Sequence, residues 1–357
     1  MRVLLLSRYA RLGPSSRIRC YQYVDYLRAH SVDVTSAPFL DNDYVKSFVS
    51  DGTRRSGHIV AAFLRRVRWL LRARQYDLLW MQYEALPWLP DLLERGLMPA
   101  GVPYVVDYDD AQFHQYDLNP SAIVRWLLKD KLDGIMARAA AVVAGNDYLA
   151  TRARQAGATE VLVLPSAVDV SLYRASLNDA ASPFTIGWIG SPTTAQYLMS
   201  IADALREACR QLPARLVLVG SGPIDLPGVP IEVRGWQEST EADEIATFDV
   251  GIMPLTDGPW EQGKCGFKLL QYMAAGLPTI ASPVGANKVI VRHGTTGFLA
   301  RTSEDWMRAF VALAESKDLC ARMGRAGRQV AEREYSTTVV APRLLETLIR
   351  AARPVET

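Results

Sequence analysis

The sequence predicts an α/β protein built from two doubly wound domains with parallel sheets. Its 357 residues exceed what one hydrophobic core usually serves, so two domains of ordinary size are expected. Short apolar runs alternate with longer amphipathic segments, as in parallel sheets with crossover helices. This alternation occurs twice, before and after a polar stretch at 166–183.

The first domain is expected over residues 1–165 and the second over 184–339, with 166–183 as the linker because it is rich in Ser, Asn and Asp. The terminal helical segment, 340–357, is expected to pack back onto the first domain. Strands of the first domain are predicted at 3–6, 32–36, 78–82, 104–106, 141–144 and 160–164, with helices at 19–29, 59–74 and 123–140. Strands of the second are predicted at 184–189, 215–219, 231–233, 250–253, 279–282 and 298–300.

Composition and charge argue against several classes of protein, among them nucleic-acid-binding, membrane-spanning and secreted proteins. A formal net charge of +2 gives no argument for nucleic-acid binding. No segment approaches about 18 uninterrupted apolar residues, and the opening apolar run is too short for a secretory signal. The cysteines are Cys20, Cys209, Cys265 and Cys320. Their spacing fits neither a metal site nor a disulfide framework, so a reduced, cytoplasmic protein is predicted.

The loop after the first strand, RLGPSSRIRC, is a candidate anion site. Gly13 gives backbone freedom, Ser15 and Ser16 are placed to cap a helix, and Arg17 adds positive charge. An ordinary capped helix start is an equal alternative. The loop lacks the three-glycine dinucleotide fingerprint, which argues against a dehydrogenase.

An acidic cluster follows the strand that ends near residue 106. Asp107, Asp109 and Asp110 crowd one strand end, so a basic partner, a cation or a raised pKa is expected. We predict that one aspartate, Asp109, meets a sugar hydroxyl near the acceptor. The alternatives are a metal clamp of Asp-x-Asp type and simple helix capping. His114 follows the cluster and is expected to be mainly structural.

Strand-end loops of the second domain carry glycines, hydroxyls and an aromatic residue. Glycine at a strand end lets a ligand approach the backbone, and a neighbouring aromatic ring can stack on a nucleobase, although a buried tryptophan is the commoner arrangement. The predicted binding residues here are Gly190, Ser191, Thr193, Gly220, Arg234 and Trp236.

The string PWEQGKCGFKLLQYMAAGLP carries the strongest local signal. Lys264 and Lys268 lie four residues apart at the start of a predicted helix, where the macrodipole also favours anions. A diphosphate suits that field. Gln271, one turn further, is placed to bind ribose hydroxyls, and Glu261 to meet a sugar. Gly266 and Phe267 open the helix and complete the predicted site.

From GPSSR to the last helix the sequence resembles the GT-B glycosyltransferases of the family 4 type (glycosyl transferases group 1). The matching motifs are KLLQYMAAGLPTIAS, LPSAVDVSLY and GNDYLA. The family usually has two glutamates eight positions apart, and Gly263 and Gln271 stand there instead. Ser191 and Thr193 lie where the family often has an arginine and a lysine for the diphosphate, so Lys264 and Lys268 are the candidates for the missing charge.

The resemblance implies two Rossmann-like domains facing across a cleft, with the nucleotide-sugar donor on the second domain and the acceptor on the first. It also implies retention of configuration, no metal and no other cofactor. Charge on the departing diphosphate would be stabilised by Lys264, Lys268 and the donor-binding residue Arg17. The catalytic candidates are Lys264, Lys268 and Asp109. A noncatalytic nucleotide-sugar-binding protein and a nucleotide-sugar-modifying Rossmann enzyme remain alternatives.

The helical stretch from Arg65 to Arg74 suggests which kind of acceptor the protein uses. Arginines, including Arg66 and Arg68, flank an apolar stripe, which is typical of helices that lie on an anionic membrane surface. A stripe that packs inward beneath solvated arginines is the alternative. We therefore predict a saccharide or lipid-linked acceptor, a peripheral position at the cytoplasmic membrane face and a role in cell-surface glycan synthesis.

Overall fold

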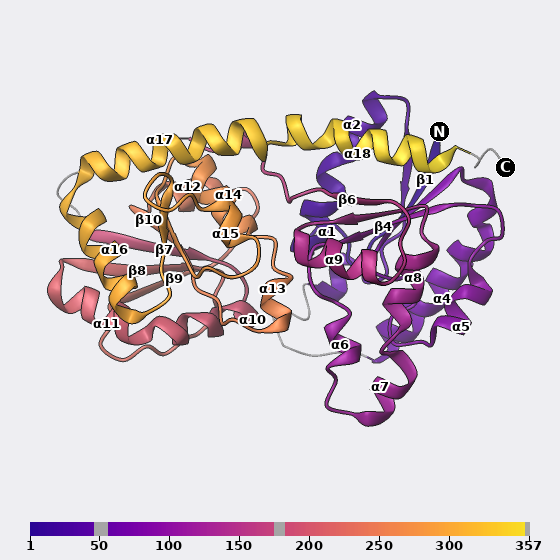
Figure 1. The fold of residues 1–357 in the computed structure, drawn as a ribbon, viewed down its shortest axis with the longest axis horizontal. Coiled ribbons are helices and arrows are strands. Elements are labelled where there is room, and N and C mark those ends of the chain that lie inside the picture. Colours follow the sequence, from indigo (N-terminus) through magenta and orange to yellow (C-terminus); the bar gives the residue numbers. More distant parts are fainter. Residues whose placement is uncertain (46–55, 175–182, 354–357) are drawn as a thin grey trace. The chain divides into compact units, whose positions relative to one another are not determined.

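The computed structural model describes residues 1–45, 56–174 and 183–353. The chain forms two compact units, one of Met1–Ser166 with Val340–Thr357 and the other of Ala167–Val339 (Figure 1). Each unit holds one parallel six-stranded sheet with helices around it. The predicted α/β class with two doubly wound domains is confirmed.

The sheet of the first unit has the order β2-β1-β3-β4-β5-β6. All its strand pairs are parallel, and Leu4 of β1 stands beside both Thr35 of β2 and Leu79 of β3. The central strands are buried on both faces, which explains their unbroken apolar runs. The strands are β1 (Arg2–Leu6), β2 (Asp33–Ser36), β3 (Leu78–Gln82), β4 (Tyr104–Tyr108), β5 (Ala141–Ala144) and β6 (Val161–Val163).

Two of the three helices predicted in the first unit are divided, whereas the one predicted at 59–74 is present as α4 (Ser56–Arg72). The helix expected at 19–29 is interrupted at Cys20, whose backbone is not helical, and the one expected at 123–140 divides near Asp130. Helices α4, α5, α8 and α9 contact one another in that order and form one layer. The helices are α1 (Pro14–Arg19), α2 (Val24–Ala29), α4 (Ser56–Arg72), α5 (Asp91–Leu97), α6 (His114–Asp117), α7 (Ala122–Leu128), α8 (Lys131–Arg138) and α9 (Asp147–Gln155).

Helix α18 (Thr337–Ala352) returns the chain to the first unit, which includes it from Val340 onward (Figure 1, yellow). Arg343 donates to the carbonyl of Val163 at 2.9 Å, and Arg350 pairs with Glu160 at 2.9 Å. The first contact attaches the helix to edge strand β6, and the second attaches it to Glu160, the residue just before that strand.

The sheet of the second unit has the order β12-β11-β10-β7-β8-β9. The predicted linker is in part a piece of this unit, because Val168 bridges to the segment before α18: its N–H donates to Tyr335 O at 2.9 Å. Residues 175–182 of that linker lie outside the described residues. The strands are β7 (Phe184–Ile189), β8 (Ala214–Val219), β9 (Ile231–Arg234), β10 (Val250–Met253), β11 (Thr279–Ala281) and β12 (Gly297–Leu299).

Two cores lie on opposite faces of this sheet, one under α12, α14 and α17 and the other under α11 and α16. No helix among the described residues is long and apolar enough to cross a membrane. The helices are α10 (Pro192–Ala195), α11 (Ala202–Gln211), α12 (Glu241–Ala246), α13 (Pro259–Gln262), α14 (Phe267–Ala274), α15 (Asn287–Ile290), α16 (Ser303–Glu315) and α17 (Lys317–Glu334).

Strand order reverses at β1 in the first sheet and at β7 in the second. In the first sheet β1 lies between β2 and β3, and in the second β7 lies between β8 and β10. Ligands of doubly wound sheets bind beyond the carboxyl ends of strands at such a reversal. The loops after β1, β3 and β4, and those after β7 to β10, are therefore the places to look for a functional site.

Candidate functional site

Three strand-end loops of the second unit pack tightly around Gly220. Its φ is +76°, and a Cβ there would lie 2.4 Å from the carbonyl oxygen of Gly190 and 3.0 Å from Cβ of Trp236. The N–H of Gly190 donates to Val219 O at 3.0 Å, and that of Gly220 to Arg234 O at 2.9 Å. Three predicted binding residues, Gly190, Gly220 and Trp236, are thus brought together by the absence of a side chain at Gly220.

A chain of hydrogen bonds continues from Trp236 to helix α14. The indole N–H of Trp236 donates to Glu241 Oε2 at 2.6 Å, and Tyr173 OH donates to Glu241 Oε1 at 3.3 Å. Gln271 Nε2 donates in turn to Tyr173 OH at 3.1 Å. Gln271 and Tyr173 are buried, whereas Trp236 and Glu241 are partly exposed. Gln271 is therefore held in place within reach of the loop after β9.

Lys268 lies one turn before Gln271 on α14, and its side chain packs against the loop after β7. Its Nζ is 5.4 Å from the centre of the Trp188 ring, a cation–π contact. A Cβ on Gly190 would lie 2.8 Å from Lys268 Cε, so Gly190 makes room for this side chain. The contacts form a ring of residues, which we call the strand-end ring. Its members are Gly190, Gly220, Trp236, Glu241, Tyr173, Gln271 and Lys268.

Helix α14 is held against the sheet by its own Tyr272. A Cβ on Gly251 of β10 would lie 2.1 Å from Cγ of Tyr272, so the ring packs directly on the glycine backbone. Tyr272 OH accepts from Ile189 N at 3.1 Å and donates to Ile252 O at 3.3 Å. These contacts set the position of α14, and with it Lys268 and Gln271, relative to β7 and β10.

Glu261 and Lys264 lie on the segment that precedes α14. Tyr197 OH donates to Glu261 Oε1 at 2.6 Å, and Lys264 Nζ is 5.6 Å from the centre of the Trp260 ring. Gly285 has a φ of +52°, and a Cβ there would lie 3.2 Å from Lys264 O. The segment is therefore packed closely, with its lysine over an aromatic ring as in Lys268.

Other predicted residues of the second unit have structural tasks. Arg234 is engaged by Glu232 and Glu244, each at 2.7 Å, so a ligand contact of its guanidinium is unsupported. Ser191 forms a capping box with Thr194 at the start of α10, and Thr193 is exposed. Gly266 adopts a left-handed conformation with φ of +69° at the start of α14, and Phe267 packs partly against the core.

At the carboxyl edge of the first unit, Asp109 is held by hydroxyl groups. Ser15 Oγ lies 2.8 and 2.6 Å from its two carboxylate oxygens, and Tyr83 OH also donates to it. Tyr83 has a φ of +62°, a conformation unusual outside glycine. The serines do not cap α1 as expected: Ser16 Oγ instead donates to Gln82 Oε1 at 2.6 Å. Asp109 is nonetheless the partly exposed carboxylate of this network.

Asp107 belongs to a buried ion pair. Arg19 Nε and Nη2 donate to its two oxygens at 2.8 and 3.1 Å, which satisfies the expected need for a basic partner. Burial raises the pKa of Asp107 to about 6, against the opposing charge of Arg19. Among residues 1–45, 56–174 and 183–353, no group of three or more His, Cys, Asp and Glu side chains is placed to hold a metal ion.

Gly13 and Arg17 lie in the loop and helix after β1. A Cβ on Gly13 would lie 2.3 Å from Cβ of Tyr9, so the glycine lets the loop fold back on that residue. Arg17 is buried rather than solvated. His114 bonds Asp117 through Nδ1 and Tyr148 through Nε2, both at 2.7 Å, in agreement with a structural role.

The sequence analysis missed a buried charge cluster directly after β3. Lys131 Nζ lies 2.7 Å from Glu84 and 3.0 Å from Glu94, and all three side chains are almost wholly buried. Tyr116 OH donates to Glu84 at 2.8 Å, and Glu94 accepts from backbone N–H groups of residues 85 and 86. Nothing in an amphipathic helix pattern marks Lys131 as buried, because lysine is normally solvated.

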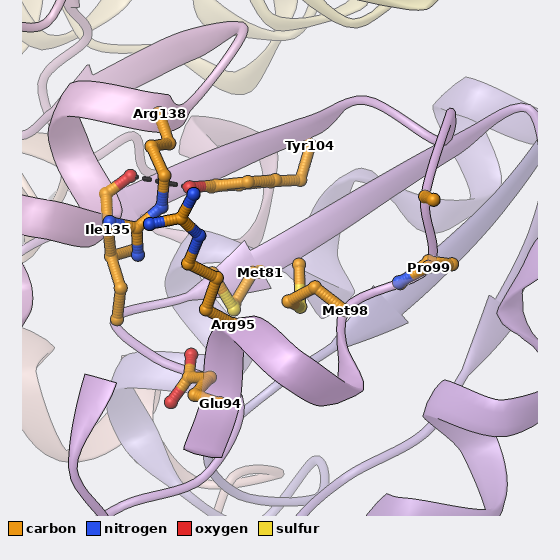
Figure 2. Close-up of a pocket in the computed structure, with 9 residues that line it drawn as sticks. Met81, Glu94, Arg95, Met98, Pro99, Tyr104, Ile135 and Arg138 are labelled. Carbon is orange, nitrogen blue, oxygen red and sulfur yellow. Dashed lines mark hydrogen bonds between the residues drawn. The ribbon is translucent and has the colours of Figure 1, made fainter. Parts of the chain in front are cut away.

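A cavity of about 270 Å³ lies between α5 and α8 (Figure 2). Its walls include Met81, Met98 and the Tyr104 ring, whose hydroxyl donates to Ile135 O at 2.7 Å. Tyr104 begins β4, whereas Asp107 stands near the end of that strand. The cavity therefore lies beneath the helical layer, apart from the carboxyl edge that carries Asp109.

Comparison with known sequences finds a family match in the second unit and two similar proteins. Residues 183–316 match the family described as Glycosyl transferases group 1. Sulfoquinovosyl transferase of Arabidopsis thaliana is 29% identical over 160 residues, and N-acetyl-alpha-D-glucosaminyl L-malate synthase of Bacillus anthracis is 27% identical over 144 residues. These matches cover 42% and 37% of this chain, and only 29% and 36% of the relatives.

Comparison with solved structures covers both units. HepE of Anabaena, in complex with UDP and glucose, matches with a TM-score of 0.69 at 17% identity over 98% of this chain and 99% of that chain. Sucrose-phosphate synthase of Thermosynechococcus elongatus matches with a TM-score of 0.72 at 15% identity over 99% of this chain and 100% of that one. The chain therefore has the GT-B fold of glycosyltransferases. Its residues 183–316 match the family model of the glycosyl transferases group 1, in agreement with the resemblance stated above.

Proposed function

We propose that the protein is a glycosyltransferase that takes a sugar from a nucleoside diphosphate donor bound by the second unit. The strand-end ring carries this proposal, because it joins a lysine, two glycines, an aromatic ring and a buried amide at the carboxyl ends of β7 to β9. Those groups match a diphosphate, a close-lying sugar and a nucleoside in one ligand. The HepE neighbour, described as bound to UDP and glucose, supports the same ligand class.

Charge on the leaving diphosphate is the part of the reaction that the protein is best equipped to stabilise. As the bond to the anomeric carbon breaks, negative charge grows on the departing phosphate, and Lys264 and Lys268 stabilise it. The configuration is retained, with the donor phosphate receiving the acceptor proton on the same face. The reaction then needs no nucleophile from the protein and no metal ion.

The acceptor is a sugar hydroxyl bound by the first unit through Asp109. Two hydroxyl donors, Ser15 and Tyr83, fix this carboxylate at a strand end, and it keeps acceptor capacity for a further hydroxyl group. A carboxylate that orients an acceptor hydroxyl should affect catalysis more than donor binding. Asp109→Asn is therefore expected to lower transfer while leaving donor affinity unchanged.

The outer face of α4 supports the proposal of a lipid-linked acceptor, of the kind used in cell-surface glycan synthesis. Arg66 is buried, so the predicted arginine surface is narrower than expected. The face is nonetheless amphipathic, because Leu64 and Leu71 are 57% and 69% exposed beside the exposed Arg68 and Arg72. Trp126 of helix α7 is a further exposed apolar side chain of the first unit, at 80%. Apolar groups interleaved with arginines suit a peripheral position on an anionic membrane.

A vesicle experiment tests the membrane position. Binding to anionic vesicles should fall steeply with salt and should be lost in the double variant Arg68→Glu/Arg72→Glu. The matched control, Arg322→Glu/Arg325→Glu, makes the same charge change on exposed positions of α17 and should bind as the wild type does. No binding at low salt, or equal loss in both variants, would show that the membrane proposal is wrong.

A donor screen tests the proposed activity. Purified protein is incubated with uridine, guanosine, adenosine and thymidine diphosphate sugars, and slow release of the nucleoside diphosphate is measured. We expect one donor to be hydrolysed, with full activity in EDTA. Thermal protection without turnover would instead identify a noncatalytic binder, which the missing glutamates at Gly263 and Gln271 make a real alternative. Activity lost in EDTA and restored by manganese would contradict metal independence.

A further inference from the structure

The strand-end ring contains a carboxylate that the sequence motifs did not single out. Gln271 occupies the position where the resemblance implies a ribose-binding glutamate, and its Nε2 is engaged by Tyr173 OH at 3.1 Å. On the other side of that hydroxyl stands Glu241, whose Oε1 accepts from Tyr173 at 3.3 Å. One phenol thus joins the amide on α14 to a carboxylate on α12.

The carboxylate of Glu241 is held in a fixed position by neutral donors. Trp236 Nε1 donates to Oε2 at 2.6 Å and Tyr173 OH donates to Oε1 at 3.3 Å, so each carboxylate oxygen accepts from one neutral donor. Glu241 is the first residue of α12 and is partly exposed, and it follows β9 at the carboxyl edge. These hydrogen bonds orient the carboxylate at the edge where a ligand is expected.

We propose that Glu241 binds the ribose diol of the donor nucleotide, in place of a carboxylate at position 271. This inference rests on the proposed function, since it assigns the nucleoside part of the same donor. It adds a specificity residue: Glu241 makes the protein select ribonucleotides over deoxyribonucleotides.

The chemistry of the diol favours a carboxylate over the amide of Gln271. A ribose presents two neighbouring O–H donors, and an ionised carboxylate offers about four acceptor positions on its two oxygens. Hydrogen bonds to a charged acceptor are stronger than those between neutral groups. Doubly wound dinucleotide-binding domains use an acidic side chain on the ribose for the same reason.

Calorimetric titration with nucleoside diphosphates tests the assignment. The wild type is titrated with uridine, guanosine, adenosine and thymidine diphosphates to find the preferred base. The tightest ribonucleotide is then compared with its 2′-deoxy analogue, and the ratio of the two affinities is measured for Glu241→Gln. Glu244→Gln is the matched control, because it makes the same change one turn later on α12, where the side chain pairs with Arg234.

The wild type and Glu244→Gln should prefer the ribonucleotide by about tenfold or more, and Glu241→Gln should reduce that preference to less than about threefold. The ribonucleotide should lose affinity while the deoxy analogue keeps most of its own. An equal loss for both analogues would show that Glu241 only supports Trp236 and Tyr173, and an unchanged ratio would likewise overturn the proposal.

Two further measurements keep the test decisive. If Glu241→Gln does not fold, Glu241→Asp keeps the charge but withdraws it by one methylene group, and the same drop in the ratio is expected. Should the wild type bind no nucleoside diphosphate in the panel, the proposed function itself fails. Should it bind one with a ratio that does not depend on Glu241, only this inference fails.

Discussion

The lysines near the strand ends differ in their neighbours between the two units. In the first unit the charges are paired with one another inside the protein, as in Arg19 with Asp107 and Lys131 with Glu84. In the second unit Lys264 and Lys268 lie over the rings of Trp260 and Trp188. An aromatic face attracts a cation, and a buried carboxylate compensates its charge more strongly.

We therefore expect the buried ion pairs of the first unit to stabilise its fold, and the two lysines of the second unit to act on a bound ligand. Buried pairs hold the first unit's loops around Asp109, and removing one partner there should mainly affect folding. The lysines of the second unit should instead affect the reaction, with little effect on folding. Paired substitutions in the two units can therefore break or sharpen the distinction.

The largest effect is expected for Lys131→Met in the first unit. The change leaves Glu84 and Glu94 buried without their cation, which should lower the free energy of unfolding by about 3 to 5 kcal/mol. Urea unfolding measures it. Lys129→Met, at a side chain that is 57% exposed, should change stability by less than about 0.5 kcal/mol. Similar losses in both variants would contradict the scaffold role.

The next effect is expected for Lys268→Met and Lys264→Met in the second unit. Methionine keeps apolar packing over the ring but removes the charge, so turnover should fall by about 10²- to 10³-fold, equivalent to about 3 to 4 kcal/mol of barrier. Thermal unfolding should hardly change. Lys288→Met, an exposed lysine on α15, is the control and should keep full activity. Wild-type turnover in both the Lys264 and the Lys268 variant would remove these lysines from the mechanism.

A smaller effect, in stability and activity together, is expected for Gly251→Ala. The added methyl would overlap the Tyr272 ring and push α14 away from the sheet, at a cost of about 1 to 3 kcal/mol. Because α14 carries Lys268 and Gln271, kcat/KM should fall as well. Gly235→Ala meets no atom within 4 Å and should be neutral. A stable Gly251→Ala protein with reduced activity would still support the positioning role, but an unaltered one would contradict it.

The smallest effect is expected when the carboxylate is moved from position 241 to position 271, on the other side of the Tyr173 hydroxyl. The double variant Glu241→Gln/Gln271→Glu keeps the net charge, and Tyr173 can then donate toward position 271 and accept from position 241. It should bind the ribonucleotide about tenfold more tightly than Glu241→Gln alone. If the second substitution restores nothing, the two positions do not share one ligand group around the phenol.

The sequence predicted the strands and the strand-end glycines well because both follow from local patterns. Buried parallel strands are continuous apolar runs, and Gly190, Gly220 and Lys268 stand at fixed distances from such runs. The alternation of strands and helices therefore locates the edge of the sheet before any contact is known.

The remaining parts of the site depend on contacts between distant residues. Tyr173, Glu241 and Gln271 meet through side-chain hydrogen bonds that span 68 and 98 positions of the chain, and no local pattern encodes them. Burial of charge was missed for a similar reason: Arg66 and Lys131 look solvated in a helical pattern, and only their tertiary surroundings show otherwise. The division of residues 19–29 likewise depends on one non-helical backbone at Cys20.

The return of α18 to β6 makes the first unit discontinuous along the chain. During synthesis the ribosome completes the whole of Ala167–Val339 before it releases Arg343 and Arg350, the residues that fasten this helix to edge strand β6. The second unit can therefore begin to fold while β6 still lacks its covering helix. An uncovered strand edge invites pairing with other chains, so the interval before α18 emerges is when the nascent protein most needs protection from aggregation.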